Sequence, residues 1–397
     1  MEVEDEYGGY ITDDYSKPLP MIEDDKEHEE CMGCPKAEHR NFYKQELFIG
    51  QGGNGKTHLN LFDEGLINAV YVAPSWKLTT EKLREIEKYD KNIDCIVHQR
   101  LFFDPYSKQE KYISKWNNYI IDEASMIIED IKQYVFKNVK GKIIFCGDLN
   151  YQLPPVVSNE MKIMVCQKYI SNEEQKIKLL TIKNCMKQKG WIYQHKQEYN
   201  KMCNELVKMV GCGKELQEMT TDGFDNVRTL TKNYRVKCDK LMKILTYIRA
   251  EIKCVKDEYV NYGHNTEYIT MHTVTKILKK ECNVITKKQM NDIYTKKDLI
   301  ICSEKVLMNE FTEQFKHIQK YRVLDNTRDY CNGDIIFEKV KKVKSELRHG
   351  FTIHSVQGIT IPEGQYLFID LRRMKSLRML YTALSRARYL SQIYIIQ

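Results

Sequence analysis

Eight consecutive residues near the start of the chain have the types and spacing of a loop that binds phosphate. Residues 50–57 read Gly-Gln-Gly-Gly-Asn-Gly-Lys-Thr, a full match to the pattern G-x-x-x-x-G-K-[ST]. Glycines in such a loop let successive backbone N–H groups point at phosphate oxygens, at a helix N-terminus that favours anions. Lys56 would reach the β- and γ-phosphates of a nucleotide, and Thr57 would offer its hydroxyl to Mg²⁺. The predicted nucleotide-binding residues are Gly50, Gly52, Gly53, Asn54, Gly55, Lys56 and Thr57.

Two adjacent acids supply the next chemical feature. The apolar run that begins at Tyr119 ends in Asp122 and Glu123, and α/β sheets place their ligands at such strand ends. Asp122 would hold Mg²⁺ together with Thr57, and Glu123 would orient or deprotonate the attacking water. An Asp-Glu pair at a strand end is common by itself. Downstream of a phosphate loop, it predicts hydrolysis of the terminal phosphate.

The elements that must position these residues alternate between strand and helix. Strand-like runs occupy residues 69–73, 119–122, 142–147, 298–302, 365–370 and 392–396. Apolar residues recur at helical spacing from Leu241 to Ile248 and from Leu377 to Leu384. This alternation predicts parallel sheets that helices cover on both faces. Residues 158–225 are lysine-rich and helical in composition, so we expect an insertion or connector there between two α/β units.

The composition fits a globular protein of two or three domains. Of the 397 residues, 42% are hydrophobic and 29% are charged. The 13 cysteines show no even framework, which favours free thiols in a reducing intracellular compartment. The chain has no signal peptide and no apolar stretch of roughly 20 residues, so we expect neither secretion nor a membrane partner.

The charge is distributed unevenly along the chain. Residues 1–30 contain twelve Asp and Glu but only Lys17 and Lys26, a net charge of −10, whereas the whole chain carries +7. The remaining residues therefore carry +17. This basic body suits a polyanionic partner such as nucleic acid, and a lysine-rich solvated surface would explain it equally well.

Residues 1–45 are expected to form an acidic flexible leader, because they are rich in acids and poor in apolar residues. Cys31 and Cys34 form a lone C-x-x-C pair within it. A zinc site needs four ligands and only His28 and His39 lie nearby, so a free cysteine pair is the favoured interpretation.

The string Gly-Asp-Leu-Asn-Tyr-Gln-Leu-Pro-Pro-Val at residues 147–156 resembles a specific motif of superfamily 1 helicases, G-D-x-x-Q-L-P-P-V, with one more residue between the Asp and the Gln. Other strings resemble that family's motifs in the family's order. They are Ala73-Pro74-Ser75, Val97-His98, Leu230-Thr-Lys-Asn-Tyr234-Arg235, Asn332-Gly333-Asp334, Thr352-Ile-His354-Ser-Val-Gln357-Gly358 and Tyr381-Thr-Ala-Leu-Ser385-Arg386-Ala387. The resemblance covers residues 46–397. The last two strings look most like the Pif and RecD branch, subgroup B, which moves 5′ to 3′ on DNA, and the compact size suggests a large DNA virus.

The resemblance implies roles for particular residues. Gln152 and Arg235 would approach the γ-phosphate of ATP, and Arg386 would act as an arginine finger beside the catalytic Lys56 and Glu123. Gln357 and Gly358 would join the nucleotide site. The residues expected to touch nucleic acid are Pro74, Ser75, Trp76, His98, Thr352 and His354. The two histidines could instead be core residues, and Trp76 could serve core packing.

The resemblance also implies an α/β fold, a P-loop NTPase with two RecA-like parallel-sheet domains. We expect a first ATP-binding domain at residues 46–157, a helical insertion at 158–225, and a second RecA-like domain at 226–397 with a reduced accessory domain. Two departures stand out. Val236 occupies a place where the branch usually has Gln, and no clear adenine-reading Gln motif precedes the phosphate loop.

The expected function is that of an ATP-dependent DNA helicase with ATP and Mg²⁺ as cofactors. Its partners would be single-stranded DNA, forked duplex DNA and replication proteins, with roles in replication, recombination or repair. If the source is viral, the compartment would be the host cytoplasm or nucleus. Two alternatives stay open: a viral RNA helicase of the same superfamily, and a nucleotide-gated nucleic-acid-binding subunit with weak ATPase.

Overall fold

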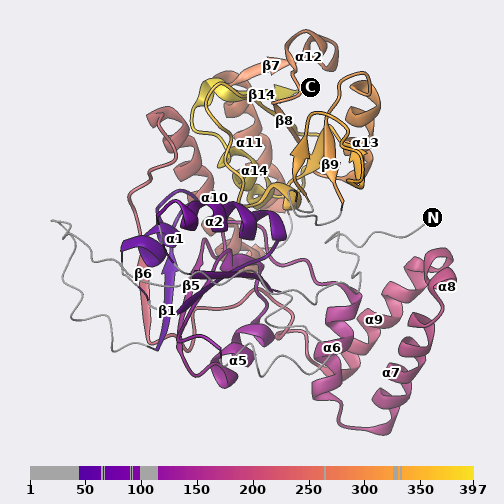
Figure 1. The fold of residues 1–397 in the computed structure, drawn as a ribbon. Helices are drawn as coiled ribbons and strands as arrows, with labels where there is room; N and C mark the ends of the chain where they lie inside the picture. Colours follow the sequence, from indigo (N-terminus) through magenta and orange to yellow (C-terminus); the bar gives the residue numbers. More distant parts are fainter. Residues whose placement is uncertain are drawn as a thin grey trace.

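The computed structural model describes residues 44–397 except 64–65, 67, 90, 92, 99–114, 263–264, 325–329 and 331–332 (Figure 1). The predicted acidic leader, apart from its last two residues, lies outside the described residues, as do the Cys31/Cys34 pair and Asn332.

The first α/β domain is built on a six-stranded parallel sheet. In spatial order its strands are β3 (Ile93–Val97), β2 (Ala69–Ala73), β4 (Asn118–Ile121), β5 (Lys142–Gly147), β1 (Gln45–Ile49) and β6 (Asn226–Thr229). The central strands are buried on both faces, which explains why they are continuous apolar runs in the sequence.

Alternate residues of each central strand enter different cores. Val70 and Val72 of β2 pack into one core with α5 (Glu129–Asn138), whereas Tyr71 packs into the other with α2 (Trp76–Glu87). This period of two fixes the two layers of helices on the sheet. Because these strands are parallel, the carboxyl ends of β1, β4 and β5 lie at the same edge of the sheet, where the predicted site residues follow.

Strand β6 completes this first sheet, although residue 226 was the expected start of the second domain. Its residues 226–229 pair in parallel with residues 46–49 of β1. The Asp225 carboxylate fixes the start of β6 by accepting hydrogen bonds from the backbone of Lys44 and Gln45, at 3.0 and 2.8 Å. The chain therefore returns to the first sheet before it enters the second.

A helical insertion separates β5 from β6 along the chain. It comprises α6 (Asn159–Tyr169), α7 (Glu173–Met186), α8 (Lys189–Gln194) and α9 (Lys196–Val210). Ser158 and Asn172 cap α6 and α7 by accepting hydrogen bonds from backbone N–H groups. Leu179, Ile182 and Leu206 extend the α5-side core into the insertion, which stands at the lower right of Figure 1.

The second α/β domain contains a five-stranded parallel sheet. In spatial order its strands are β12 (Gly350–Thr352), β8 (Leu299–Cys302), β13 (Leu367–Asp370), β14 (Ile393–Ile396) and β7 (Asn283–Ile285). The core on one face involves α10 (Asp239–Tyr262), α11 (Asn265–Glu281) and α14 (Leu377–Leu384), and that on the other α12 (Lys287–Ile293) and α13 (Lys305–Gln314).

A small antiparallel sheet accompanies the second domain. Its strands, in spatial order, are β10 (Ile335–Ile336), β9 (Tyr321–Val323) and β11 (Ser345–Leu347). It lies where a short accessory insertion was expected. No helix in the described part of the chain is long and apolar enough to cross a membrane.

Candidate active site

The phosphate loop connects β1 to the short helix α1 (Lys56–His58). Gly53 and Gly55 adopt positive φ angles of 93° and 76°, which residues other than glycine rarely adopt. The Lys56 amino group folds back into the loop and donates to the carbonyl oxygens of Gly50 and Gln51, at 2.6 and 3.0 Å. Burial lowers the pKa of Lys56. A nucleotide phosphate would replace these carbonyls as the lysine's partner.

The predicted magnesium ligands lie together. Asp122 follows β4, and its Oδ2 accepts hydrogen bonds from the Thr57 hydroxyl at 2.9 Å and the Tyr71 hydroxyl at 2.8 Å. Among the described residues, no cluster of three or more His, Cys, Asp or Glu could form a metal site from protein alone. Magnesium in nucleotide sites needs only one or two carboxylates, because phosphates and waters supply the remaining oxygens. Thr57 and Asp122 therefore fit this metal.

Glu123 occupies a strained and half-buried position beside Asp122. Its φ of 52° is uncommon for a residue with a side chain. Burial, and then the charge of Asp122, raise the pKa of Glu123. A carboxylate with a raised pKa is a better proton acceptor, so the position suits the predicted general base.

A chain of side-chain hydrogen bonds runs from Gln152 to the second domain. Ser125 donates to Oε1 of Gln152 at 3.3 Å, and the Gln357 amide donates to the Ser125 oxygen at 3.1 Å. The same amide group lies 3.4 Å from Oε2 of Glu123. Gln357 was expected in the nucleotide site, and here it links Glu123, the predicted base of that site, to the other α/β domain.

Two arginines that follow β6 in the sequence, Arg235 and Arg386, lie close to the phosphate loop. A Cβ atom on Gly52 would lie 2.8 Å from Nη1 of Arg235 and 3.5 Å from Nη2 of Arg386. Arg386 is fully buried at the end of α14, where it donates to the backbone oxygens of Thr382 and Ile359, at 3.0 and 3.2 Å. Among the described residues, neither guanidinium forms an ion pair with a carboxylate.

The electrostatics of these arginines favour an anion at the loop. Burial, and then the charge of Arg386, lower the pKa of Arg235 to about 9, and burial lowers the pKa of Arg386. Two like charges that share a poorly hydrated site are costly. A phosphate group between them would relieve the cost, since phosphate accepts charge-assisted hydrogen bonds from guanidinium groups.

The segment that leads to Arg235 also holds the loop itself. The Asn233 amide donates to Gly52 O at 3.0 Å, and the Tyr234 backbone N–H donates to Gly53 O at 2.8 Å. The Tyr234 ring lies 3.5 Å from the place of a Cβ on Gly55, and 55% of this residue is exposed. Tyr234 was not among the site residues expected from the sequence. An exposed aromatic ring beside a phosphate loop offers a stacking face for a nucleobase.

The residues expected to touch nucleic acid separate into two groups. Pro74, Ser75 and Trp76 lie at the start of α2, where Ser75 is exposed and its oxygen accepts a hydrogen bond from the helix backbone. Thr352 and His354 are partly exposed at the end of β12. The two segments meet, because a Cβ on Gly358 would lie 2.6 Å from the Leu78 side chain of α2.

His98 does not share that surface. It is 7% exposed, and its Nε2 lies 3.1 Å from the backbone oxygen of Asp122. Burial lowers the pKa of His98 to about 4, so the imidazole is neutral at physiological pH. The position favours the alternative of a core histidine, here one that supports the strand end carrying Asp122.

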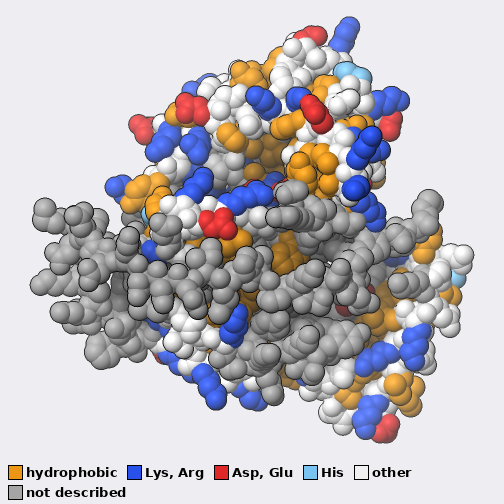
Figure 2. All heavy atoms as spheres, viewed as in Figure 1, with side chains coloured by type: hydrophobic (Ala, Val, Ile, Leu, Met, Phe, Trp, Pro, Cys, Tyr) orange, Lys and Arg blue, Asp and Glu red, His pale blue; other side chains and the backbone are white. Residues whose placement is uncertain are grey.

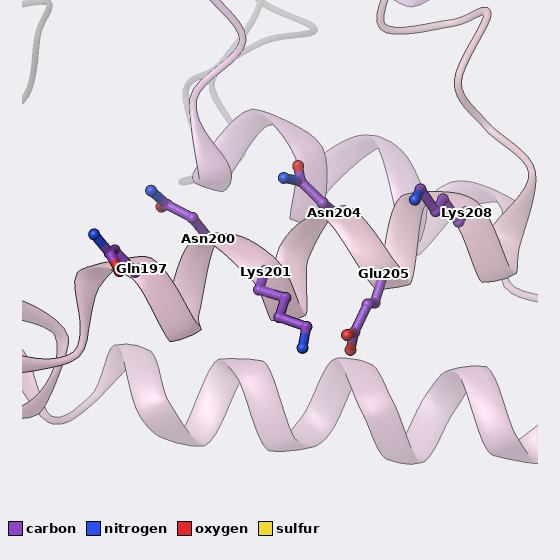
Figure 3. A pocket seen from close by; sticks show the side chains of 6 residues that line it. All are labelled: Gln197, Asn200, Lys201, Asn204, Glu205 and Lys208. Carbon is purple, nitrogen blue, oxygen red and sulfur yellow. The ribbon is translucent and has the colours of Figure 1, made fainter.

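Basic side chains are common on one face of the molecule (Figure 2). Figure 2 shows Lys and Arg side chains spread over both α/β domains on the face that it displays. A separate polar depression lies on α9 of the helical insertion, lined by Gln197, Asn200, Lys201, Asn204, Glu205 and Lys208 (Figure 3). Glu205 is paired there with Lys178 of α7 at 2.7 Å. None of these residues belongs to the phosphate-loop site.

The fold and the phosphate loop together define a P-loop protein with two RecA-like α/β domains. No protein-family model matches the chain, and no curated protein matches it. Its fold resembles that of a Pif1 helicase from Bacteroides in complex with ADP-AlF3 and single-stranded DNA, with a TM-score of 0.53 over 90% of this chain and 89% of that one.

The fold also resembles that in a second solved structure, of DNA unwinding at forked double-stranded DNA by two coordinating Pif1 helicases. The TM-score is again 0.53, over 89% of this chain and 88% of that one. Sequence identity is 16% in both comparisons. The resemblance therefore shows a shared fold along nearly the whole length of both chains.

Proposed function

We propose that this protein is an ATP-dependent DNA helicase or translocase that moves on single-stranded DNA. The observation that carries the proposal is the convergence of the phosphate loop, the Asp122–Glu123 pair, Arg235 and Arg386 at one place. A phosphate loop, acids that bind the metal and position water, and arginines that stabilise the transition state are the recurring parts of enzymes that hydrolyse nucleoside triphosphates.

The first domain would bind and hydrolyse the nucleotide. Lys56 exchanges its contacts with Gly50 and Gln51 for phosphate oxygens. Thr57 and Asp122 would hold Mg²⁺, which would neutralise charge on the phosphates when bound. Glu123 orients the attacking water and accepts its proton, and its raised pKa suits this role.

The second domain would sense and complete the reaction. Arg235 and Arg386 neutralise the charge that develops on the transferred phosphate, while Gln357 adjusts the position of Glu123 across the domain boundary. Closing and opening of the two domains would change the grip on the strand at Ser75 and His354. Alternating grips move the protein along the strand.

Three considerations support DNA as the substrate and 5′ to 3′ as the direction. The solved Pif1 structures of similar fold are described in complex with single-stranded DNA or at forked duplex DNA. The chain outside its first 30 residues carries +17, as a phosphate-binding body requires. The T-I-H and A-L-S-R-A strings resemble the branch that moves 5′ to 3′. Replication, recombination or repair would employ such an activity.

One set of assays tests the proposal. ATP turnover of the purified full-length chain is measured alone, with single-stranded DNA and with single-stranded RNA, and strand displacement is measured on duplexes with 5′ or 3′ tails. We expect stimulation by DNA and displacement on 5′-tailed substrates, with both lost in the folded Lys56→Ala variant. Stimulation by RNA alone would favour the RNA helicase, and nucleotide-dependent binding without turnover would favour the binding subunit.

A further inference from the structure

The segment Asp148–Leu153 lies between the two domains: Leu149 is buried in the core of the first domain, whereas Leu153 is buried in the core of the second. It follows β5 directly and carries Gln152. Leu153 is 3% exposed and lies in the core of the second domain together with Leu241 and Tyr381. Tyr151 packs against the same core.

Asp148 is held by two side chains of the second domain. The Arg249 Nη1 of α10 donates to both Asp148 carboxylate oxygens, at 2.6 and 2.5 Å, and the Tyr381 hydroxyl of α14 donates to Oδ2 at 2.6 Å. The Arg249 guanidinium also lies 3.8 Å above the Tyr151 ring. Asp148 is fully buried, so these partners must compensate its charge.

A second arginine binds the other end of the segment. Arg378 of α14 donates through Nε to the backbone oxygen of Gln152 and through Nη2 to Glu218 at 2.8 Å. Glu218 accepts a hydrogen bond from the Asn150 backbone at 3.1 Å. Helices of the second domain therefore hold Asp148 and Gln152, whereas Glu218, which pairs with Ile128 of the first domain, holds Asn150 between them.

We propose that Arg249, Tyr381 and Arg378 are positioning residues that couple Asp148 and Gln152 of this segment to movements of the second domain. This inference rests on the proposed function. A rotation of the second domain would displace Gln152 and, through Ser125 and Gln357, the surroundings of Glu123.

The consequence is a direct mechanical link between the strand and the nucleotide. The second domain carries Thr352 and His354, so its position depends on the bound strand, and Gln152 follows that position. Without the link, the nucleotide would still bind to the phosphate loop. The occupied strand site, however, could no longer set the geometry around the terminal phosphate.

The test uses full-length protein with three variants that loosen the link and one matched control. Arg249→Met and Arg378→Met remove one arginine each, and Tyr381→Phe removes only a hydroxyl and keeps the ring. The control Arg372→Met breaks a comparable pair, because Arg372 donates to the fully buried Asp370 at 2.7 to 3.1 Å, but both residues belong to the second domain.

We expect the stimulation of kcat by single-stranded DNA to fall in all three variants by roughly 5- to 150-fold, the usual range for coupling between two sites. The KM for ATP should stay within about threefold, because the phosphate loop is untouched. Arg249→Lys should restore part of the stimulation. Arg372→Met should retain it, even if its thermal midpoint falls as far as that of Arg249→Met.

A second measurement does not depend on turnover. The backbone N–H groups of Tyr151 and Gln152 donate to Asp148 O at 3.2 and 3.1 Å, so hydrogen exchange at these amides reports whether the segment is held. Exchange should accelerate in Arg249→Met and not in Arg372→Met. Unchanged exchange, or full DNA stimulation in Arg249→Met, would overturn the proposal. A wild-type protein without ATP turnover would instead overturn the proposed function. The exchange data would still decide whether Arg249 holds the segment in place.

Discussion

Arg386 is a buried cation whose hydrogen bonds go to neutral oxygens and not to a carboxylate. Its partners are Thr382 O, Ile359 O and the Ser385 hydroxyl. A protein that needed the arginine only for stability would gain more from an acid at this place, because a buried charge without a counter-ion is costly. We therefore expect a phosphate group of the substrate to serve as its counter-ion.

The first prediction concerns Arg386→Ala. ATP affinity should stay within a few-fold, whereas turnover with DNA should fall by about 10³-fold or more, since an arginine finger acts mainly on transition-state charge. Nucleotide binding and single-turnover hydrolysis measure the two effects. Because the residue is buried, a thermal melt must show that the variant is folded. Normal DNA-stimulated hydrolysis would mean that Arg386 does not face the nucleotide.

The second prediction concerns Glu123→Gln, which keeps size and removes the base. Binding should persist through Lys56 and Thr57, while turnover should fall by about 10²- to 10⁴-fold. The pKa of Glu123 is raised, so wild-type kcat should increase as the pH rises through that pKa, where the carboxyl loses its proton. The remaining kcat of Glu123→Gln should not show this increase with pH. An equal loss of binding would assign Glu123 a structural role.

The third prediction concerns Tyr234, whose exposed ring lies beside Gly55. Tyr234→Ala should raise the KM for ATP with little change in kcat, and Tyr234→Phe should behave as wild type. Stacking of an aromatic ring on a base contributes about 1–3 kcal/mol. If both variants keep the wild-type KM, the ring does not contact the nucleobase.

At the scale of elements, a buried polar network holds the small antiparallel sheet to the second domain. Lys320, which directly precedes β9, is 2% exposed and donates to the Tyr294 hydroxyl at 3.3 Å and to Asp298 O. The Tyr294 hydroxyl donates in turn to Nδ1 of the buried His349 at 2.9 Å. Lys320 forms no ion pair in this network, and the charge of the nearby Asp298 offsets the effect of its burial only in part.

The fourth prediction follows from Lys320. Burial lowers the pKa of Lys320 to about 7 from an ordinary value of 10.5, so between these values the unfolded chain binds more protons than the folded one. Stability should therefore rise with pH from about 7 to about 10 and be lost again as the pH falls. Urea unfolding midpoints at several pH values measure this. The stability of Lys320→Met relative to wild type should fall as the pH rises, because only the wild type gains stability from Lys320 losing its proton. A relative stability that does not change with pH would contradict the lowered pKa.

How much of the fold the sequence predicts depends on how an element is buried. Residues 69–73 and 142–147 were expected as strands and form β2 and β5 with those bounds, because strands buried on both faces are continuous apolar runs. Strand β6 reads Asn-Val-Arg-Thr and lies at the sheet edge, where such a run is not required. Its place became visible only through its pairing with β1.

The candidate site shows a similar division. The phosphate loop and the two acids after β4 can be found from local strings, because each motif lies within one strand and the loop that follows it. The contacts of Asp148 with Arg249 and Tyr381 join residues that are 101 and 233 positions apart. No local pattern marks such a contact, since it depends on how two domains dock.

At the scale of the whole molecule, the fifth prediction tests the basic body against the acidic leader. Affinity for single-stranded DNA should fall steeply with salt, because phosphate neutralisation releases counterions. Deletion of residues 1–30 removes a charge of −10 and should leave binding intact or tighten it. Binding isotherms at several salt concentrations, for both proteins, measure the slope. Weaker binding by the shortened chain would make the leader part of the nucleic-acid site.

The pairing of β6 with β1 has a consequence for biosynthesis. Ribosomes deliver the chain from its N-terminus, and residues 45–147 emerge with five strands of the first sheet. The sixth strand follows only after the whole helical insertion, so β1 keeps an open edge on the nascent chain until residue 229 has left the exit tunnel. An open edge invites pairing with other chains. We therefore expect that chaperones which bind nascent chains engage this protein during that interval, and that a chain cut before β6 aggregates.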